Sequence, residues 1–222
     1  MTSIVSSIKR QIRRAFMTRA QRRFELVGPP ELWEMKRRFQ IDFLRRFGLE
    51  PQHYLLDIGC GVLRGGIPII DYLEVGHYYG VEPRAKAMAE GRKELAESKL
   101  EYKQPHLTVS ENLGELSLAR AFDFLWAFSV LIHLEDPILE DVIRFVARHL
   151  KSDGVFYANV DTADKEDGQW LEFPGVRRPM HFYADVLDRN GLGFTDVGSL
   201  KELGHITGGE ADDQRMLAIR KK

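Results

Sequence analysis

Hydrophobic positions along the chain switch repeatedly between a short and a helical period, which predicts strands alternating with helices. Runs rich in apolar residues predict seven strands, at residues 53–58, 78–82, 107–110, 122–129, 155–160, 194–200 and 215–220. Helical spacing of apolar residues predicts helices at residues 65–73, 84–95, 137–150 and 183–190, so most strands are followed by a helix. This order is typical of an α/β protein with a parallel sheet, and the short connections favour a doubly wound sheet.

The last two predicted strands lack a helix between them. Residues 201–214 form a polar, glycine-containing segment instead. Strands joined without a crossover helix pair antiparallel. We therefore predict a seven-stranded, mostly parallel sheet with an antiparallel last strand, whose ligand lies at the carboxyl ends of the parallel strands.

The first 24 residues differ in charge from the rest of the chain. They contain seven Lys or Arg residues and no acid, a local charge of +7, whereas the remaining residues sum to −8. The apolar residues from Ile4 to Phe16 fall on one stripe of a helix, and the basic residues lie away from it. Because Gly28-Pro29-Pro30 then breaks the chain, we predict a basic amphipathic arm at residues 1–28 and one domain at residues 29–222.

Several functions suit such an arm. It can dock on its own domain, lie on an anionic membrane through residues 4–23, or meet an acidic partner or nucleic acid. An Arg-rich start without acids also suits a mitochondrial presequence. The helix predicted at residues 31–47 carries Trp33 and Lys36, which are candidates for a lid, although so apolar a helix is expected to pack on the core.

Composition narrows the class of protein. The chain contains a single cysteine, Cys60, so it forms no intramolecular disulfide, and a reducing compartment such as the cytoplasm fits best. Its seven histidines show neither HxxxH nor HExxH spacing, so we assign no metal. No apolar run approaches the roughly 20 residues that span a bilayer.

The most informative segment is YLLDIGCGVLRGG, residues 54–66, where the first predicted strand runs into glycines. Gly59, Gly61 and Gly65 match GxGxxxG, a pattern that lets a ligand approach the main chain but is shared by several nucleotide sites. Asp57 precedes the glycines and can attract a ligand ammonium group. Glu82 ends the second strand, where a carboxylate can accept both hydroxyls of a ribose.

Together with YYGVEP and FDFLWAFSVLIHL, this segment resembles the class I S-adenosylmethionine-dependent methyltransferases. The resemblance covers about residues 30–222 and rests on the order of the motifs. It implies the Rossmann-like methyltransferase fold, S-adenosyl-L-methionine as cofactor and methyl transfer as the reaction. The antiparallel end of the sheet agrees with it.

The resemblance also implies roles for individual residues. Gly59, Cys60 and Gly61 pass under the methionine part of the cofactor, Asp57 holds its amino group, and Glu82 binds the ribose. Either Glu111 or Asn112 faces the adenine while Leu113 packs on the ring, although this segment departs from the usual Asp of the family. Ser129 lines the methyl-donor side through its backbone. Arg64 either reaches the cofactor carboxylate or caps the turn with a surface ion pair.

The acceptor side is less defined. His133, just after the fourth strand, is the candidate general base, and the alternative is that it caps the next helix. His181 and Tyr183 belong to a segment that closes over the acceptor in the resembling family, or they simply begin a helix. The fourth strand ends in AFSV and lacks the NPPY-type signature with which the resembling family methylates amino groups of nucleobases or glutamine. This disfavours nucleic-acid bases and leaves small molecules, lipid-linked groups, sugars and protein side chains, of which we expect a small molecule.

Two rival functions remain at this stage. An NADP-dependent oxidoreductase suits the glycine pattern with Arg64, but Asp57 and Glu82 argue against it, since Glu82 would repel a 2′-phosphate. A methyltransferase-like domain could also bind its nucleoside without catalysis, leaving the function to the arm at a membrane or RNA.

Overall fold

The computed structural model describes residues 18, 23, 25–162, 164, 166–170 and 173–222. The predicted basic arm therefore lies outside the described residues except for Thr18, Arg23 and residues 25–28. Its association with a membrane or partner stays a prediction, as does the domain boundary after residue 28. Among the described helices, none is both long and apolar enough to cross a membrane.

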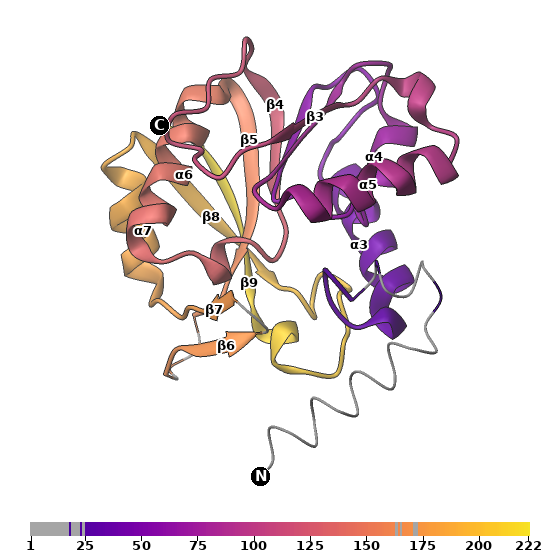
Figure 1. Cartoon of the computed structure of the whole chain (residues 1–222). Coiled ribbons are helices and arrows are strands. Elements are labelled where there is room, and N and C mark those ends of the chain that lie inside the picture. Colours follow the sequence, from indigo (N-terminus) through magenta and orange to yellow (C-terminus); the bar gives the residue numbers. More distant parts are fainter. Residues whose placement is uncertain (1–17, 19–22, 24, 163, 165, 171–172) are drawn as a thin grey trace.

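Strands and helices alternate as predicted, and most of their ends differ from the predicted ends by a few residues (Figure 1). The helices are α3 (Trp33–Arg46), α4 (Gly66–Tyr72), α5 (Ala85–Glu97), α6 (Asp136–His149) and α7 (Met180–Asp188). The main strands are β1 (Leu55–Ile58), β2 (Tyr78–Glu82), β3 (His106–Val109), β4 (Phe122–Ala127), β5 (Leu150–Val160), β8 (Leu192–Ser199) and β9 (Arg215–Lys221). A further hairpin of β6 (Gly168–Trp170) and β7 (Phe173–Gly175) has no counterpart in the prediction.

The seven main strands form one sheet in the order β3-β2-β1-β4-β5-β9-β8. The strands from β3 to β5 are parallel, whereas β9 runs antiparallel to both β5 and β8, which confirms the predicted sheet. The strand order reverses between β1 and β4. In a doubly wound sheet this switch point is where a ligand binds, at the carboxyl ends of the strands.

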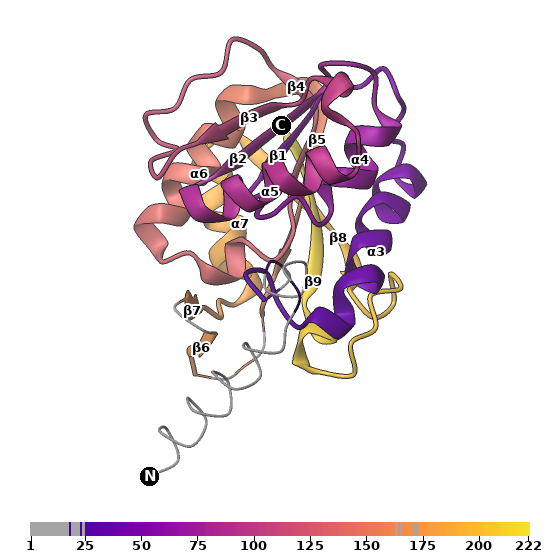
Figure 2. The ribbon, with the colours of Figure 1, turned by 45° about the vertical axis from the view of Figure 1, so that its right-hand side comes forward.

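Alternating side chains of the strands divide the core into two layers. Helices α3, α4 and α5 cover one face of the sheet, and α6 and α7 cover the other (Figures 1 and 2). Leu55 faces the first layer and its neighbour Leu56 faces the second, as expected for a strand buried on both sides. Both faces of the parallel sheet are thus covered, which leaves its carboxyl edge as the place for a ligand.

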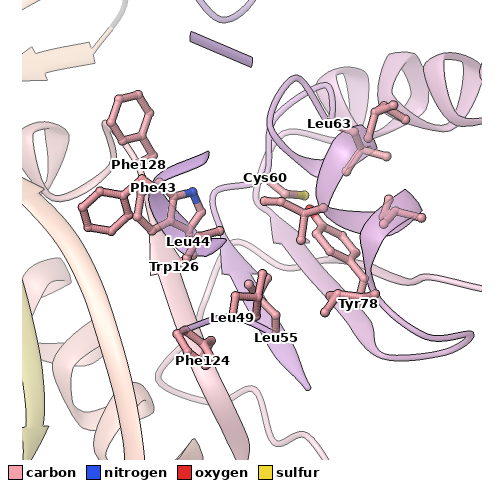
Figure 3. Packing of buried hydrophobic residues seen from close by; sticks show 14 of the residues in the cluster. Phe43, Leu44, Leu49, Leu55, Cys60, Leu63, Tyr78, Phe124, Trp126 and Phe128 are labelled. Carbon is pink, nitrogen blue, oxygen red and sulfur yellow. The ribbon is translucent and has the colours of Figure 1, made fainter. Parts of the chain in front are cut away.

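Aromatic packing docks α3 on the sheet next to this edge. The ring of Trp126 on β4 lies parallel to that of Phe128, with centroids 5.6 Å apart, and 5.4 Å from the ring of Phe43 on α3 (Figure 3). The indole Nε1 of Trp126 donates a hydrogen bond of 3.0 Å to Oε1 of Gln40, which is also on α3. A Cβ atom at Gly65 would come within 2.2 Å of that same oxygen. The third glycine of the turn therefore makes room for α3.

Candidate active site

A cavity of about 490 Å³ opens at the carboxyl edge of the sheet, at the switch point between β1 and β4. This volume lies in the range of roughly 300 to 1,000 Å³ that is usual for small-molecule sites. Eight of the predicted site residues line it: Asp57, Gly59, Cys60, Gly61, Arg64, Glu82, Ser129 and His133. The fold thus brings together residues that are up to 76 positions apart in the chain (133 minus 57).

The glycine turn has the bare backbone that the sequence predicts. Gly59 and Gly61 have φ angles of +71° and +60°, in the left-handed region that favours glycine. A Cβ atom at Gly59 would lie 2.6 Å from Val130 across the switch point, and one at Gly61 would lie 2.9 Å from Val27. Glycine is therefore required here both by backbone conformation and by close packing.

The Asp57 carboxylate is buried at the end of β1 and lines the cavity. Its Oδ2 accepts a hydrogen bond of 2.7 Å from the hydroxyl of Tyr78. Burial raises the pKa of Asp57 to about 7, and the nearby charge of Glu82 acts in the same direction. The hydrogen bond from Tyr78 opposes this rise and lowers the pKa. A ligand ammonium group beside this carboxylate would stabilise its ionised form.

The Glu82 carboxylate at the end of β2 has two defined partners. Its Oε2 accepts a hydrogen bond of 2.9 Å from the backbone N–H of Gly61. Its Oε1 accepts one of 2.6 Å from Nε of Arg84, a residue that sequence reasoning missed although it lies only two positions away. Glu82 is 2% exposed and lines the cavity, so its carboxylate is held in a fixed place at the carboxyl edge.

Arg64 is a buried cation in the glycine turn. Its Nη1 donates a hydrogen bond of 2.8 Å to the carbonyl of Val27, and its Nε is buried with no partner among the described residues. The guanidinium lies 6.0 Å from the centre of the Trp33 ring, and burial lowers its pKa to about 10. No described carboxylate lies within 4 Å of it, and at 8% exposure it does not form the surface ion pair considered above.

Ser129 follows β4 in a strained conformation. Its φ angle is +57°, which is uncommon for a residue with a side chain. The buried side chain of Asn159 holds it there, since Asn159 Oδ1 accepts a hydrogen bond of 2.7 Å from the Ser129 N–H. Asn159 is fixed in turn by a hydrogen bond of 2.6 Å from its Nδ2 to Oε1 of Gln214. Such strain is common at binding sites, where the surrounding structure maintains it.

His133 lies in a 3-10 turn (Leu131–His133) and lines the cavity, so it does not serve merely to cap α6. Its Nδ1 lies 2.6 Å from the carbonyl oxygen of Pro174 in β7. A carbonyl only accepts, so Nδ1 carries the proton and Nε2 carries the lone pair. Burial lowers the pKa of His133, which keeps the ring neutral near pH 7.

Four other predicted residues lie away from the cavity. Asn112 is exposed, and Leu113 is partly buried against the core layer that contains α6 and α7. Neither residue lines the cavity, so the predicted adenine contact stays a prediction. His181 is exposed on the first turn of α7, and Tyr183 is buried in the core, where burial raises its pKa. No three His, Cys, Asp or Glu side chains of the described residues come close enough together to hold a metal ion.

The segment before α3 also lines the cavity, which sequence reasoning missed. Its carbonyls accept hydrogen bonds from two arginines of the site, Leu26 from Arg84 (3.1 Å) and Val27 from Arg64 (2.8 Å). Arg23, the last basic residue of the predicted arm, anchors the segment. Its guanidinium is buried against three carboxylates on one face of α5, those of Glu90, Glu94 and Glu97. Their spacing at positions i, i+4 and i+7 is the signal that could have indicated this contact.

Replacing Arg23 with methionine is expected to weaken cofactor binding roughly fivefold, by about 1 kcal/mol. The reason is that the anchor of residues 26–28, which line the cavity, is lost while the side chains predicted to contact the cofactor stay in place. Titration calorimetry with S-adenosylhomocysteine measures the change. Arg38→Met, an exposed residue on α3, is the matched control. Equal affinity of the two variants would show that the anchor does not act on the site.

Comparison with known proteins agrees with this geometry. Residues 56–156 match the family model described as a methyltransferase domain. Magnesium protoporphyrin IX methyltransferase from Synechocystis PCC 6803, solved with bound S-adenosylmethionine, is 18% identical with a TM-score of 0.66, over 96% of this chain and 97% of that one. The glycopeptide N-methyltransferase MtfA is 16% identical with a TM-score of 0.65, over 84% and 90%. A search of curated protein sequences finds no significant match.

The family match runs from β1 into β5, and so includes the glycine turn, Glu82 and His133. The sheet order and the antiparallel β9 supply the rest of the fold. Residues 56–156 therefore match a methyltransferase domain, and the chain has the Rossmann-like fold of the solved methyltransferases to which it is similar. One of these was solved with bound S-adenosylmethionine.

Proposed function

We propose that the cavity binds S-adenosylmethionine through three side chains and that the protein methylates a small molecule. The observation that supports this most strongly is the placement of Asp57, Glu82 and Arg64 in one cavity. Each complements one polar group of the cofactor. Asp57 would bind the ammonium, Glu82 would accept the ribose hydroxyls, and Arg64 would pair with the carboxylate. The Arg64 guanidinium, whose Nε has no partner among the described residues, provides a donor, and the bare glycine turn provides space for the amino-acid tail.

Binding at Glu82 requires one exchange of partners. Its Oε1 holds Arg84, so a ribose hydroxyl would share this oxygen or displace the arginine. Oε2 keeps the Gly61 N–H, which maintains the carboxylate in position during the exchange. Arg84 retains other contacts, because it donates to the Leu26 carbonyl and lies 5.0 Å from the centre of the Phe173 ring.

When bound, S-adenosylmethionine supplies an electrophilic methyl group on a sulfonium. The main task of the protein is then to align the acceptor with this methyl, an orientation effect worth roughly 7 to 11 kcal/mol at best. Ser129 and the glycine turn define the donor side of the cavity, while His133 and the β6–β7 hairpin border another part of it. If the acceptor atom carries a proton, Nε2 of neutral His133 is the group that accepts it. The cavity volume supports a small acceptor.

Calorimetry with two ligands tests the cofactor assignment. We expect S-adenosylhomocysteine to bind and NADP to show no measurable binding, because Glu82 would repel the 2′-phosphate. Preferential binding of NADP would favour the oxidoreductase. Incubation with S-adenosylmethionine labelled on its methyl group and with cell extract then tests catalysis. A bound cofactor with no labelled product would favour a methyltransferase-like binding domain.

A further inference from the structure

The cavity contains cations that its own carboxylates do not neutralise. Its Lys and Arg residues, among those that the structure describes, are Lys36, Arg64, Arg84 and Arg177. Arg84 pairs with Glu82, and Arg177 lies 3.4 Å from a carboxylate oxygen of Asp161 and 3.3 Å from one of Glu210. No described carboxylate lies within 4 Å of Lys36 or Arg64.

Lys36 and Arg64 belong to one region of the cavity wall. Lys36 lies on α3 between Trp33, whose ring faces Arg64, and Gln40, which packs on Gly65. Burial and the positive charge of Arg64 lower the pKa of Lys36 to about 8. A half-buried ammonium next to another cation is unfavourable unless an anion accompanies it.

Neighbouring groups do not supply that anion. The attractive charge that acts on Lys36 is that of Asp212, whose carboxylate accepts hydrogen bonds from the backbone N–H groups of Thr207 (2.7 Å) and Gly208 (2.8 Å) and lies 3.8 Å from Nδ1 of His205. His205 is 1% exposed, with neither ring nitrogen hydrogen-bonded among the described residues. Burial, Lys36 and Arg64 lower the pKa of His205 to about 4, so this ring is neutral at pH 7. The positive charge of this wall therefore comes from Lys36 and Arg64.

The bound cofactor neutralises only one of the two cations. S-adenosylmethionine has a single carboxylate, which Arg64 takes in the proposed function on which this inference rests. We propose that Lys36 binds an anionic group, a carboxylate or a phosphate, of the methyl acceptor. Phe128, Ile132 and Phe173 provide apolar wall for the body of such a molecule. The acceptor is thus an amphiphilic acid, and its anion positions it in the cavity.

Calorimetry on the protein saturated with S-adenosylhomocysteine tests this assignment. The probes are benzoate, phenyl phosphate and the neutral benzamide, so that the two anions distinguish carboxylate from phosphate. We expect at least one anion to bind at least roughly tenfold more tightly than benzamide. Lys36→Met should lower the affinity for that anion roughly tenfold and leave the affinity for S-adenosylhomocysteine within about twofold of wild type. Lys86→Met, an exposed residue on α5, should change neither.

Other results would overturn the assignment. Equal binding of anions and benzamide, no measurable anion binding, or unchanged anion binding in Lys36→Met would each exclude Lys36 as the anion site. Weaker binding of S-adenosylhomocysteine in Lys36→Met would instead assign Lys36 to the cofactor carboxylate. A wild-type protein that does not bind S-adenosylhomocysteine would contradict the proposed function itself, which keeps the two failures distinct.

Discussion

Replacing Glu82 with alanine is expected to weaken the binding of S-adenosylhomocysteine by about 2 to 4 kcal/mol, the value of one or two charge-assisted hydrogen bonds. In the structure this carboxylate is fixed by the Gly61 N–H and by Arg84 and lines the cavity. In the proposed function, its loss removes the acceptor for the ribose hydroxyls. It also leaves the Gly61 N–H without its partner, so the fold must be checked separately.

Two measurements and two comparison variants make this prediction decisive. Thermal unfolding shows whether the variant is folded, and calorimetry gives its affinity. Glu82→Gln keeps an oxygen for the Gly61 N–H but removes the charge, so it should fall between wild type and alanine. Glu101→Ala changes an exposed acid in a 3-10 turn before β3 and should bind as wild type does. Unchanged affinity of a folded Glu82→Ala variant would contradict the ribose assignment.

Asp57→Asn is expected to stabilise the cofactor-free protein at high pH and to lower its affinity for the cofactor. Burial raises the pKa of Asp57 from 3.8 to about 7, so the fold disfavours its ionised form. The stability that this residue contributes is fully present below pH 3.8 and is lost as the pH rises through about 7. At pH 8 the loss amounts to roughly 4 kcal/mol, which asparagine avoids while its Oδ1 still accepts the Tyr78 hydrogen bond.

Cofactor binding should have the opposite pH dependence. The ligand ammonium prefers ionised Asp57, so the affinity of wild type for S-adenosylhomocysteine should rise roughly tenfold from pH 6 to pH 8. In Asp57→Asn the affinity should be lower and the rise absent. Denaturant unfolding at pH 5 and 8, with calorimetry at pH 6 and 8, measures both effects. A variant less stable than wild type at pH 8 would show that ionised Asp57 is favourable in the fold.

Much of the fold follows from local pattern. Buried strands on both sides of a parallel sheet appear as short apolar runs, and glycines with positive φ interrupt them at Gly59 and Gly61. The β6–β7 hairpin escaped prediction because its strands of three residues are too short for a periodic pattern. The segment 201–214 was expected to be a polar loop, yet His205 is almost fully buried between Phe39 and Phe128.

The sequence by itself determined the succession of strands and helices along the chain. It also determined the glycine turn and the two acids Asp57 and Glu82, because these lie at strand ends whose positions the local pattern defines. Only the tertiary structure decided which distant side chains share the cavity. The contact of Arg23 with α5 and the approach of Lys36 to Arg64 depend on how α3 and the segment before it pack on the glycine turn. Such docking is a matter of shape between elements far apart in the chain. The spacing of the three acids on α5 marks one side of the Arg23 contact, but no local pattern names the partner that reaches them.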